Sequence, residues 1–203
     1  MKITSNKAFA IIELLVWIFI FSLWLVSIYA IIITTIRIND YNSNYIVATN
    51  LAKEQIELIR NVRDSNYQVL KPFDLIEPDW DSFELTDKLK TWNYYTIENI
   101  FWTNTDFPIL INDINTWFLE WKENLNSMVL SRLCLDDKNL YTYNCSDSDN
   151  VETEYYRFFY VDELKNSNWT IDNAYKITSK VVWYKRWYHE FEINTVLADW
   201  KRL

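Results

Sequence analysis

Two groups of residues in this 203-residue chain have side chains and spacings that could form a disulfide or bind a metal ion. Cys134 and Cys145 are its two cysteines. If they face an oxidising compartment, a disulfide is favoured over two free thiols, and it would stabilise a loop without catalysing a reaction. Asp147, Asp149 and Glu152 have a spacing that can bind calcium, although a solvated acidic loop is the favoured interpretation.

Features of common catalytic centres are largely missing from the sequence. His189 is the single histidine, so pairs of histidine ligands are excluded and a Ser-His triad is disfavoured. It alternates with strand-like residues, which favours a packed histidine over a ligand. No Gly-x-Ser-x-Gly motif is present. We therefore expect a protein that is not an enzyme and needs no cofactor.

Glu13 is the one charged residue in an apolar run that covers residues 9–36. A membrane-spanning helix needs about 20 apolar residues, so this run is long enough, and it is too long for an ordinary secretory signal peptide. A carboxylate inside such a segment is expensive and indicates function. Lys2 and Lys7 precede the run, which predicts a cytoplasmic N-terminus and a globular part outside the cytoplasmic membrane.

The segment Lys7-Ala-Phe-Ala-Ile-Ile-Glu-Leu-Leu-Val16 resembles the leader region of type IV prepilins. The resemblance implies that a prepilin peptidase removes residues 1–8 by cutting between Ala8 and Phe9, and that Phe9 is then N-methylated. Ala8 stands where the family more often has glycine. Residues 9–36 would remain as membrane anchor and filament core. Glu13 would be the family's fifth-position glutamate, which pairs with the N-terminal amine of a neighbouring subunit.

The helix is predicted to continue through residues 37–66, so that it runs from about 9 to 64. Asn39–Asn44 are poor helix formers and predict a bend or a locally melted turn. Glu57 and Arg60 are three residues apart and are expected to pair on the exposed face. The stretch Asn50–Asn66 resembles the corresponding helix end of minor pilins in the type IV pilus modification group. Apolar residues recur every three or four positions and predict one buried stripe, made of Ile38, Tyr41, Tyr45, Ala48, Ala52, Ile56, Ile59 and Val62.

Residues 67–203 carry the pattern of a β-rich domain, with polar connections at 67–90 and 136–152. A hairpin turn is expected at Lys185–Trp187. The overall prediction is an α+β fold, in which an antiparallel sheet packs on the second half of the long helix. Aromatic and β-branched runs predict strands at Tyr94–Ile97, Met128–Leu130, Tyr155–Val161, Tyr175–Tyr184 and Tyr188–Leu197.

The net charge of -8 argues against general nucleic-acid binding, which requires a basic surface. The C-terminal part is slightly basic, and a solvated sheet face is the favoured explanation. The basic residues there are Lys180, Lys185, Arg186, Lys201 and Arg202.

Glycine is absent, although average usage predicts roughly 14 in a chain of this length. The chain has 11 tryptophans instead, and several occupy positions typical of glycine. Trp169 follows Asn168, as in an Asn-Gly hairpin. We hypothesise that the gene comes from a lineage that reads UGA as glycine; the alternative is a genuinely glycine-free, tryptophan-rich protein. Trp183 and Trp200 are expected to be true tryptophans. The suspected glycines are Trp17, Trp24, Trp80, Trp92, Trp102, Trp117, Trp121, Trp169 and Trp187.

Together these features predict a minor type IV pilin, held first in the cytoplasmic membrane and then in an extracellular pilus. Its expected partners are the prepilin peptidase, other pilin subunits through the N-terminal helix, and the membrane. One alternative is a pseudopilin of a type II secretion or DNA-uptake machine, which shares the same sequence features. An alternative of a different class is a membrane-tethered extracytoplasmic binding module or enzyme.

Overall fold

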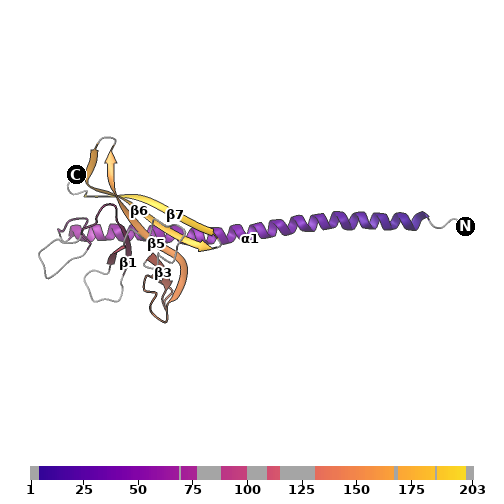
Figure 1. Ribbon diagram of the computed structural model, residues 1–203, viewed down its shortest axis with the longest axis horizontal. Coiled ribbons are helices and arrows are strands. Elements are labelled where there is room, and N and C mark those ends of the chain that lie inside the picture. Colours follow the sequence, from indigo (N-terminus) through magenta and orange to yellow (C-terminus); the bar gives the residue numbers. More distant parts are fainter. Residues whose placement is uncertain are drawn as a thin grey trace. The chain divides into compact units, whose positions relative to one another are not determined.

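The computed structural model describes residues 5–68, 70–76, 88–99, 109–114, 131–166, 169–185 and 187–199. The chain divides into two compact units, Met1–Ile46 and Val47–Leu203. The helix α1 begins in the first unit and ends in the second, and the strands belong to the second (Figure 1). The elements are α1 (Ser5–Gln68), β1 (Tyr94–Asn99), β2 (Ile109–Ile114), β3 (Arg132–Leu135), β4 (Tyr141–Thr142), β5 (Val151–Asn166), β6 (Trp169–Lys185) and β7 (Trp187–Ala198).

Helix α1 extends a few residues beyond both ends of the predicted span of 9–64. It is uninterrupted at Asn39–Asn44, so the melted turn expected there is wrong. Propensity is a weak prior, and neighbouring residues override it here. Tyr41 and Tyr45 stack one turn apart with ring centroids 6.1 Å apart, a pairing that stabilises the helical conformation.

The part of α1 within the first unit exposes a nearly continuous apolar surface from Ile11 onward. Among the described residues, α1 is the one helix that is long and apolar enough to cross a membrane. The hydroxyl groups of Ser27 and Thr34 donate to carbonyl oxygens one turn earlier, at 2.9 and 2.8 Å. Such bonds satisfy polar groups without water, which suits an apolar environment. The first unit is therefore a candidate membrane span.

The seven described strands form one antiparallel sheet in the order β2-β1-β5-β3-β4, and β6 pairs with β5 and β7. One edge of β5 pairs with β3 through its first half and with β1 near Tyr160. Its other edge pairs with β6 over most of its length, and β6 in turn pairs with β7. The three longest strands thus lie side by side, across the C-terminal half of α1 (Figure 1).

Two apolar clusters hold the sheet against the second half of α1. In one, Leu58 and Ile59 of the helix join Phe159, Val161 and Ile177 of the sheet. The other cluster contains Ala48, Leu51, Ala52, Leu133, Val181 and Trp183. The α+β fold, with an antiparallel sheet packed on the helix, is confirmed. The predicted stripe is buried at Ala48, Ala52, Ile56 and Ile59 and partly buried at Val62, whereas Ile38, Tyr41 and Tyr45 are exposed.

Residues of β5 alternate between the helix-facing clusters and a cluster on the other side of the sheet, as the two-residue strand period requires. Phe159 and Val161 face α1, while Tyr156 and Phe158 pack with Val182 and Ile114 in the other cluster. Four of the predicted strand segments lie within β1, β5, β6 and β7. The fifth, Met128–Leu130, lies outside the described residues.

One of the predicted connecting segments contains strand. The polar region 136–152 carries β4 and the first residues of β5. Lys185 and Trp187 are the paired end residues of the antiparallel strands β6 and β7, so the hairpin between these strands lies where it was predicted. Polarity predicted a loop at 136–152, but β4 and the start of β5 form there because they pair with β3, an interaction that polarity does not report.

Candidate functional site

The predicted processing site lies in the first turns of α1. The backbone is helical at Ala8 and Phe9, so cleavage between them requires this end of the helix to open locally. Glu13 lies on the exposed surface of the same helix, and no ion pair joins it to another described residue. Its carboxylate is therefore available to a group from another molecule.

Cys134 and Cys145 form a disulfide, with Cα atoms 5.5 Å apart. Cys134 lies in β3 and is fully buried. The closed loop contains β4, whose Tyr141 pairs with Leu135 of β3. The disulfide and this short ladder hold the loop against the sheet.

We expect removal of both cysteines by Cys134→Ser and Cys145→Ser to lower the free energy of unfolding by about 3 kcal/mol, the entropy of a loop of this length. Urea unfolding in detergent, followed by tryptophan fluorescence, measures the change. Asp137→Asn in the same loop is the control, because it leaves the cross-link intact. An unchanged unfolding midpoint for the double variant would contradict a stabilising role of the disulfide.

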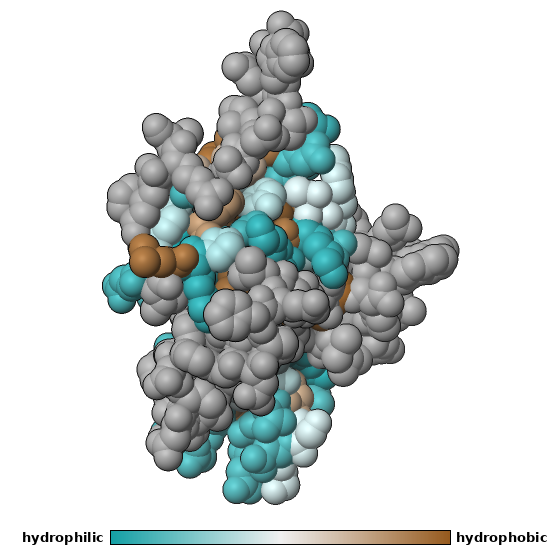
Figure 2. Space-filling model, turned by 90° about the vertical axis from the view of Figure 1, so that its left-hand side faces the viewer, coloured by the Kyte–Doolittle hydropathy of each residue, from teal (hydrophilic) through white to brown (hydrophobic). Residues whose placement is uncertain are grey.

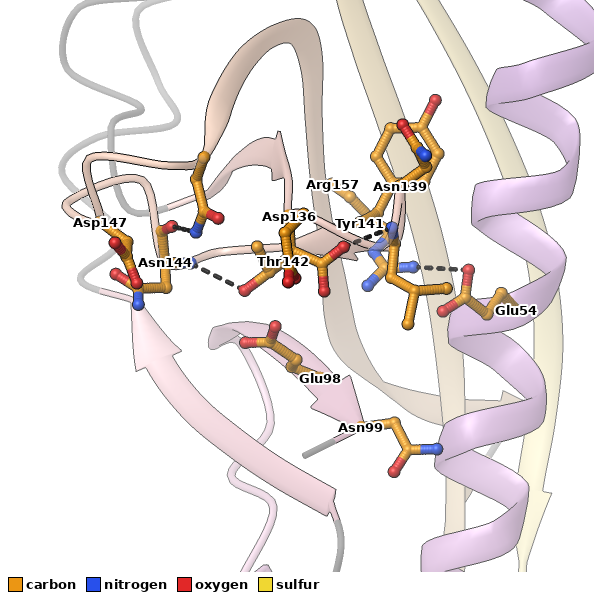
Figure 3. A pocket seen from close by; sticks show the side chains of 13 residues that line it. Glu54, Glu98, Asn99, Asp136, Asn139, Tyr141, Thr142, Asn144, Asp147 and Arg157 are labelled. Atoms are coloured by element: carbon orange, nitrogen blue, oxygen red, sulfur yellow. Dashed lines mark hydrogen bonds and ion pairs between the residues drawn. The ribbon is translucent and has the colours of Figure 1, made fainter. Parts of the chain in front are cut away.

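A cavity of about 630 Å³ lies beside this loop in the second unit. Figure 3 shows that α1 contributes Glu54, the end of β1 contributes Glu98 and Asn99, and the loop contributes most of the remaining residues. Carboxylates from all three elements line the cavity, and Arg157 is the one cation among the described residues that line it. Its surroundings favour positive over negative ligands. The other lining residues are Asp136, Asp137, Asn139, Leu140, Tyr141, Thr142, Asn144, Asp147 and Asn150.

Arg157 connects three parts of the second unit. Its side chain is only 1% exposed, and its Nη1 atom lies 3.2 Å from a carboxylate oxygen of Glu54 on α1. Its Nη2 donates to the carbonyl oxygen of Ile97 in β1 at 3.2 Å. Its Nε donates to the hydroxyl oxygen of Tyr143 at 3.0 Å, and the guanidinium also stacks over that ring. Through Arg157, the disulfide loop, the sheet and the helix are joined by polar contacts.

The electrostatics of this cluster keep the arginine charged and the tyrosine neutral. Burial acts to lower the pKa of Arg157, but the interactions with Tyr143 and Glu54 outweigh it and the pKa is raised. Burial raises the pKa of Tyr143, and Arg157 only partly opposes this. The Tyr143 hydroxyl therefore keeps its proton, which it donates to the Arg157 carbonyl oxygen at 2.9 Å.

The weak calcium candidates are not brought together around one point. Asp147 Oδ1 accepts a bond from the backbone N–H of Asp149 at 3.5 Å, and Glu152 pairs with Arg132 at 2.8 Å. Within the described ranges, no group of three His, Cys, Asp or Glu side chains could hold a metal ion. His189 stacks on Trp183, with ring centroids 5.3 Å apart, and is half-buried, which agrees with a packed histidine.

Sequence reasoning missed the cluster of Glu54, Tyr143 and Arg157. A signal was available, because Arg157 has the same strand parity as Phe159 and Val161 and therefore points toward the helix. A charge at such a position needs a partner, and Glu54 on the facing helix provides one. The expected pair of Glu57 with Arg60 does form, at 2.7 Å.

The suspected glycine positions fall in several environments. Trp17 and Trp24 are exposed on the first unit's helix. Trp169 begins β6 opposite Asn166, and Trp187 begins β7. Trp92 has a positive φ of 68°. The remaining suspects, Trp80, Trp102, Trp117 and Trp121, lie outside the described residues, as does Trp200.

Comparison of the chain with models of protein families, with curated proteins and with solved structures finds no match.

Proposed function

We propose that this protein is a minor type IV pilin, a structural subunit that a prepilin peptidase processes and that joins a pilus through its N-terminal helix. The observation that carries the proposal is the prepilin-like segment Lys7–Val16 at the start of a long apolar helix. The α+β fold of the second unit supports it, because a sheet on the C-terminal half of such a helix is the arrangement expected of a pilin.

The physical role follows from the exposed surface of the helix. Large apolar side chains from Ile11 to Ile36 are mostly exposed, so they need lipid or other helices to cover them. Membrane lipid covers them before assembly, and like helices cover them in the filament. If Trp17 and Trp24 are glycines, these positions also allow close approach of neighbouring helices.

The second unit would then form the outer surface of the filament or of its tip. Figure 2 views this unit from the end of Figure 1 opposite the N-terminus, and its coloured surface is largely hydrophilic with scattered hydrophobic residues. Such a surface is typical of a domain exposed to solvent. The acidic cavity beside the disulfide loop favours a second candidate, a membrane-tethered binding module, which would retain an uncut N-terminus.

The N-terminus of the native protein separates these candidates. Peptide-mapping mass spectrometry on the source membrane should find a mature N-terminus at Phe9, carrying a methyl group. In cells that express a prepilin peptidase, Ala8→Gly should still be cut, whereas Ala8→Leu should stay unprocessed because the resemblance requires a small residue there. An intact Met1, or a cut after the apolar run, would overturn the proposal.

A further inference from the structure

The absence of glycine is a feature that the proposed function does not explain. Backbone geometry tests it independently, because glycine is the residue that adopts positive φ without steric cost. Among the described residues, positive φ occurs at Leu70 (59°), Trp92 (68°) and Asn139 (61°). Asparagine enters this left-handed region readily, and Leu70 closely follows the end of α1, where helices often end left-handed. Trp92 is the one tryptophan in this set.

The backbone at position 92 is held by its neighbours. The N–H of Trp92 donates to the carbonyl oxygen of Val161 at 2.8 Å, and the N–H of Val161 donates to the carbonyl oxygen of Asn93 at 3.1 Å. Val161 is fully buried in the core. The N–H of Lys90 donates to the Tyr95 hydroxyl oxygen at 2.9 Å. These hydrogen bonds fix the backbone of the turn into β1 before and after position 92. Any residue at position 92 must therefore adopt the left-handed conformation.

The indole ring of Trp92 contributes little to the stability of the fold. The residue is 51% exposed. Its ring makes an edge contact with Tyr160 at 6.4 Å between centroids, and Lys165 Nζ lies 5.3 Å from it. Cation–π contacts of this kind are weak when they are exposed to water. Removing the ring therefore costs little, whereas a Cβ atom at this φ is unfavourable.

Trp183 and Trp187 provide the contrast. Trp183 is 1% exposed and packs with Ala48, Leu51 and Leu133, so a glycine there would leave a large cavity. Trp187 is 71% exposed like a surface residue, but it lies in β7 and is not among the residues with positive φ. A high exposed fraction alone therefore does not indicate glycine. The positive φ at position 92 does indicate it.

We propose that the protein, as its own host makes it, carries glycine at position 92 and tryptophan at position 183, because that host reads UGA as glycine and UGG as tryptophan. The inference goes beyond the proposed function and does not depend on it. Among the suspected positions, the backbone conformation selects Trp92, and the buried Trp183 serves as a position where the core requires tryptophan.

Mass spectrometry of the native protein tests both assignments. Trypsin cleaves after Lys and Arg, so it releases Thr91–Lys122, which contains position 92, and Val181–Lys185, which contains position 183. Fragment spectra should place glycine at 92 in the first peptide and tryptophan at 183 in the second. Tryptophan at 92, or glycine at 183, would overturn the proposal.

Recombinant full-length variants, made in a host with the standard code, test the conformational argument. Trp92→Gly should have a folded-to-unfolded ratio about fivefold above that of Trp92→Ala, because alanine keeps the Cβ that opposes positive φ. At Trp187 the order should reverse, since glycine weakens an extended strand relative to alanine. Urea unfolding in detergent measures the four ratios. If Trp92→Gly is no more stable than Trp92→Ala, position 92 does not require glycine.

Discussion

Replacing Glu13 with alanine will leave the protein in the membrane but remove it from the filament. The substitution makes the apolar run 9–36 more apolar, so insertion is retained. In the assembled filament, Glu13 is proposed to face the positively charged amine of a neighbouring Phe9 in a dry helical bundle. Removing one partner of a buried ion pair costs roughly 3–5 kcal/mol, because the other charge is left without compensation. We therefore expect incorporation to fall at least about 100-fold.

The measurement compares sheared filaments with membranes by immunoblotting, in a strain whose own copy of the gene is deleted. Ser22→Ala is the matched control on the same helix, because its hydroxyl donates within the helix, to the carbonyl oxygen of Phe19 at 2.7 Å. It should assemble normally. Glu13→Gln tests the charge itself and should fail like Glu13→Ala. Normal incorporation of either Glu13 variant would remove the charge pair from the assembly mechanism.

Replacing Arg157 with methionine will destabilise the second unit by about 3 kcal/mol or more. Methionine fills a similar volume but cannot donate hydrogen bonds. The Ile97 carbonyl oxygen and the Tyr143 hydroxyl oxygen would each lose a buried donor. Each buried polar group left unsatisfied costs about 1–3 kcal/mol. The loop closed by the disulfide would also lose the contacts of its Tyr143 with the guanidinium group.

Glu54→Gln is the matched control for the arginine. The Glu54 side chain is 49% exposed, so water replaces much of what the ion pair provides, and the loss should stay below about 1 kcal/mol. Thermal unfolding in detergent, followed by near-ultraviolet circular dichroism, compares the two variants. Equal effects would mean that Arg157 acts only through Glu54. A fully stable Arg157→Met would mean that the buried guanidinium has no structural role.

The sequence by itself determined the elements whose signals are local. The apolar run 9–36 and the stripe from Ala48 onward predicted one long helix. Helix periodicity is visible in the sequence because it relates residues only three or four positions apart. Aromatic and β-branched runs predicted the strands around Phe159, Ile177 and Phe191, because residues of these types favour extended backbone. The prepilin-like leader and Glu13 are likewise visible without a fold.

Only the tertiary structure decided which distant residues meet. Polarity predicted a loop at Tyr141–Thr142, whereas pairing with β3 makes it a strand. The Glu54, Tyr143 and Arg157 cluster joins a helix, a loop and a strand, and no local pattern specifies that meeting. The positive φ of Trp92 follows from its hydrogen bond to Val161, far along the chain. Local sequence sets what each segment can be, while burial and hydrogen bonding between segments select the conformation that each finally adopts.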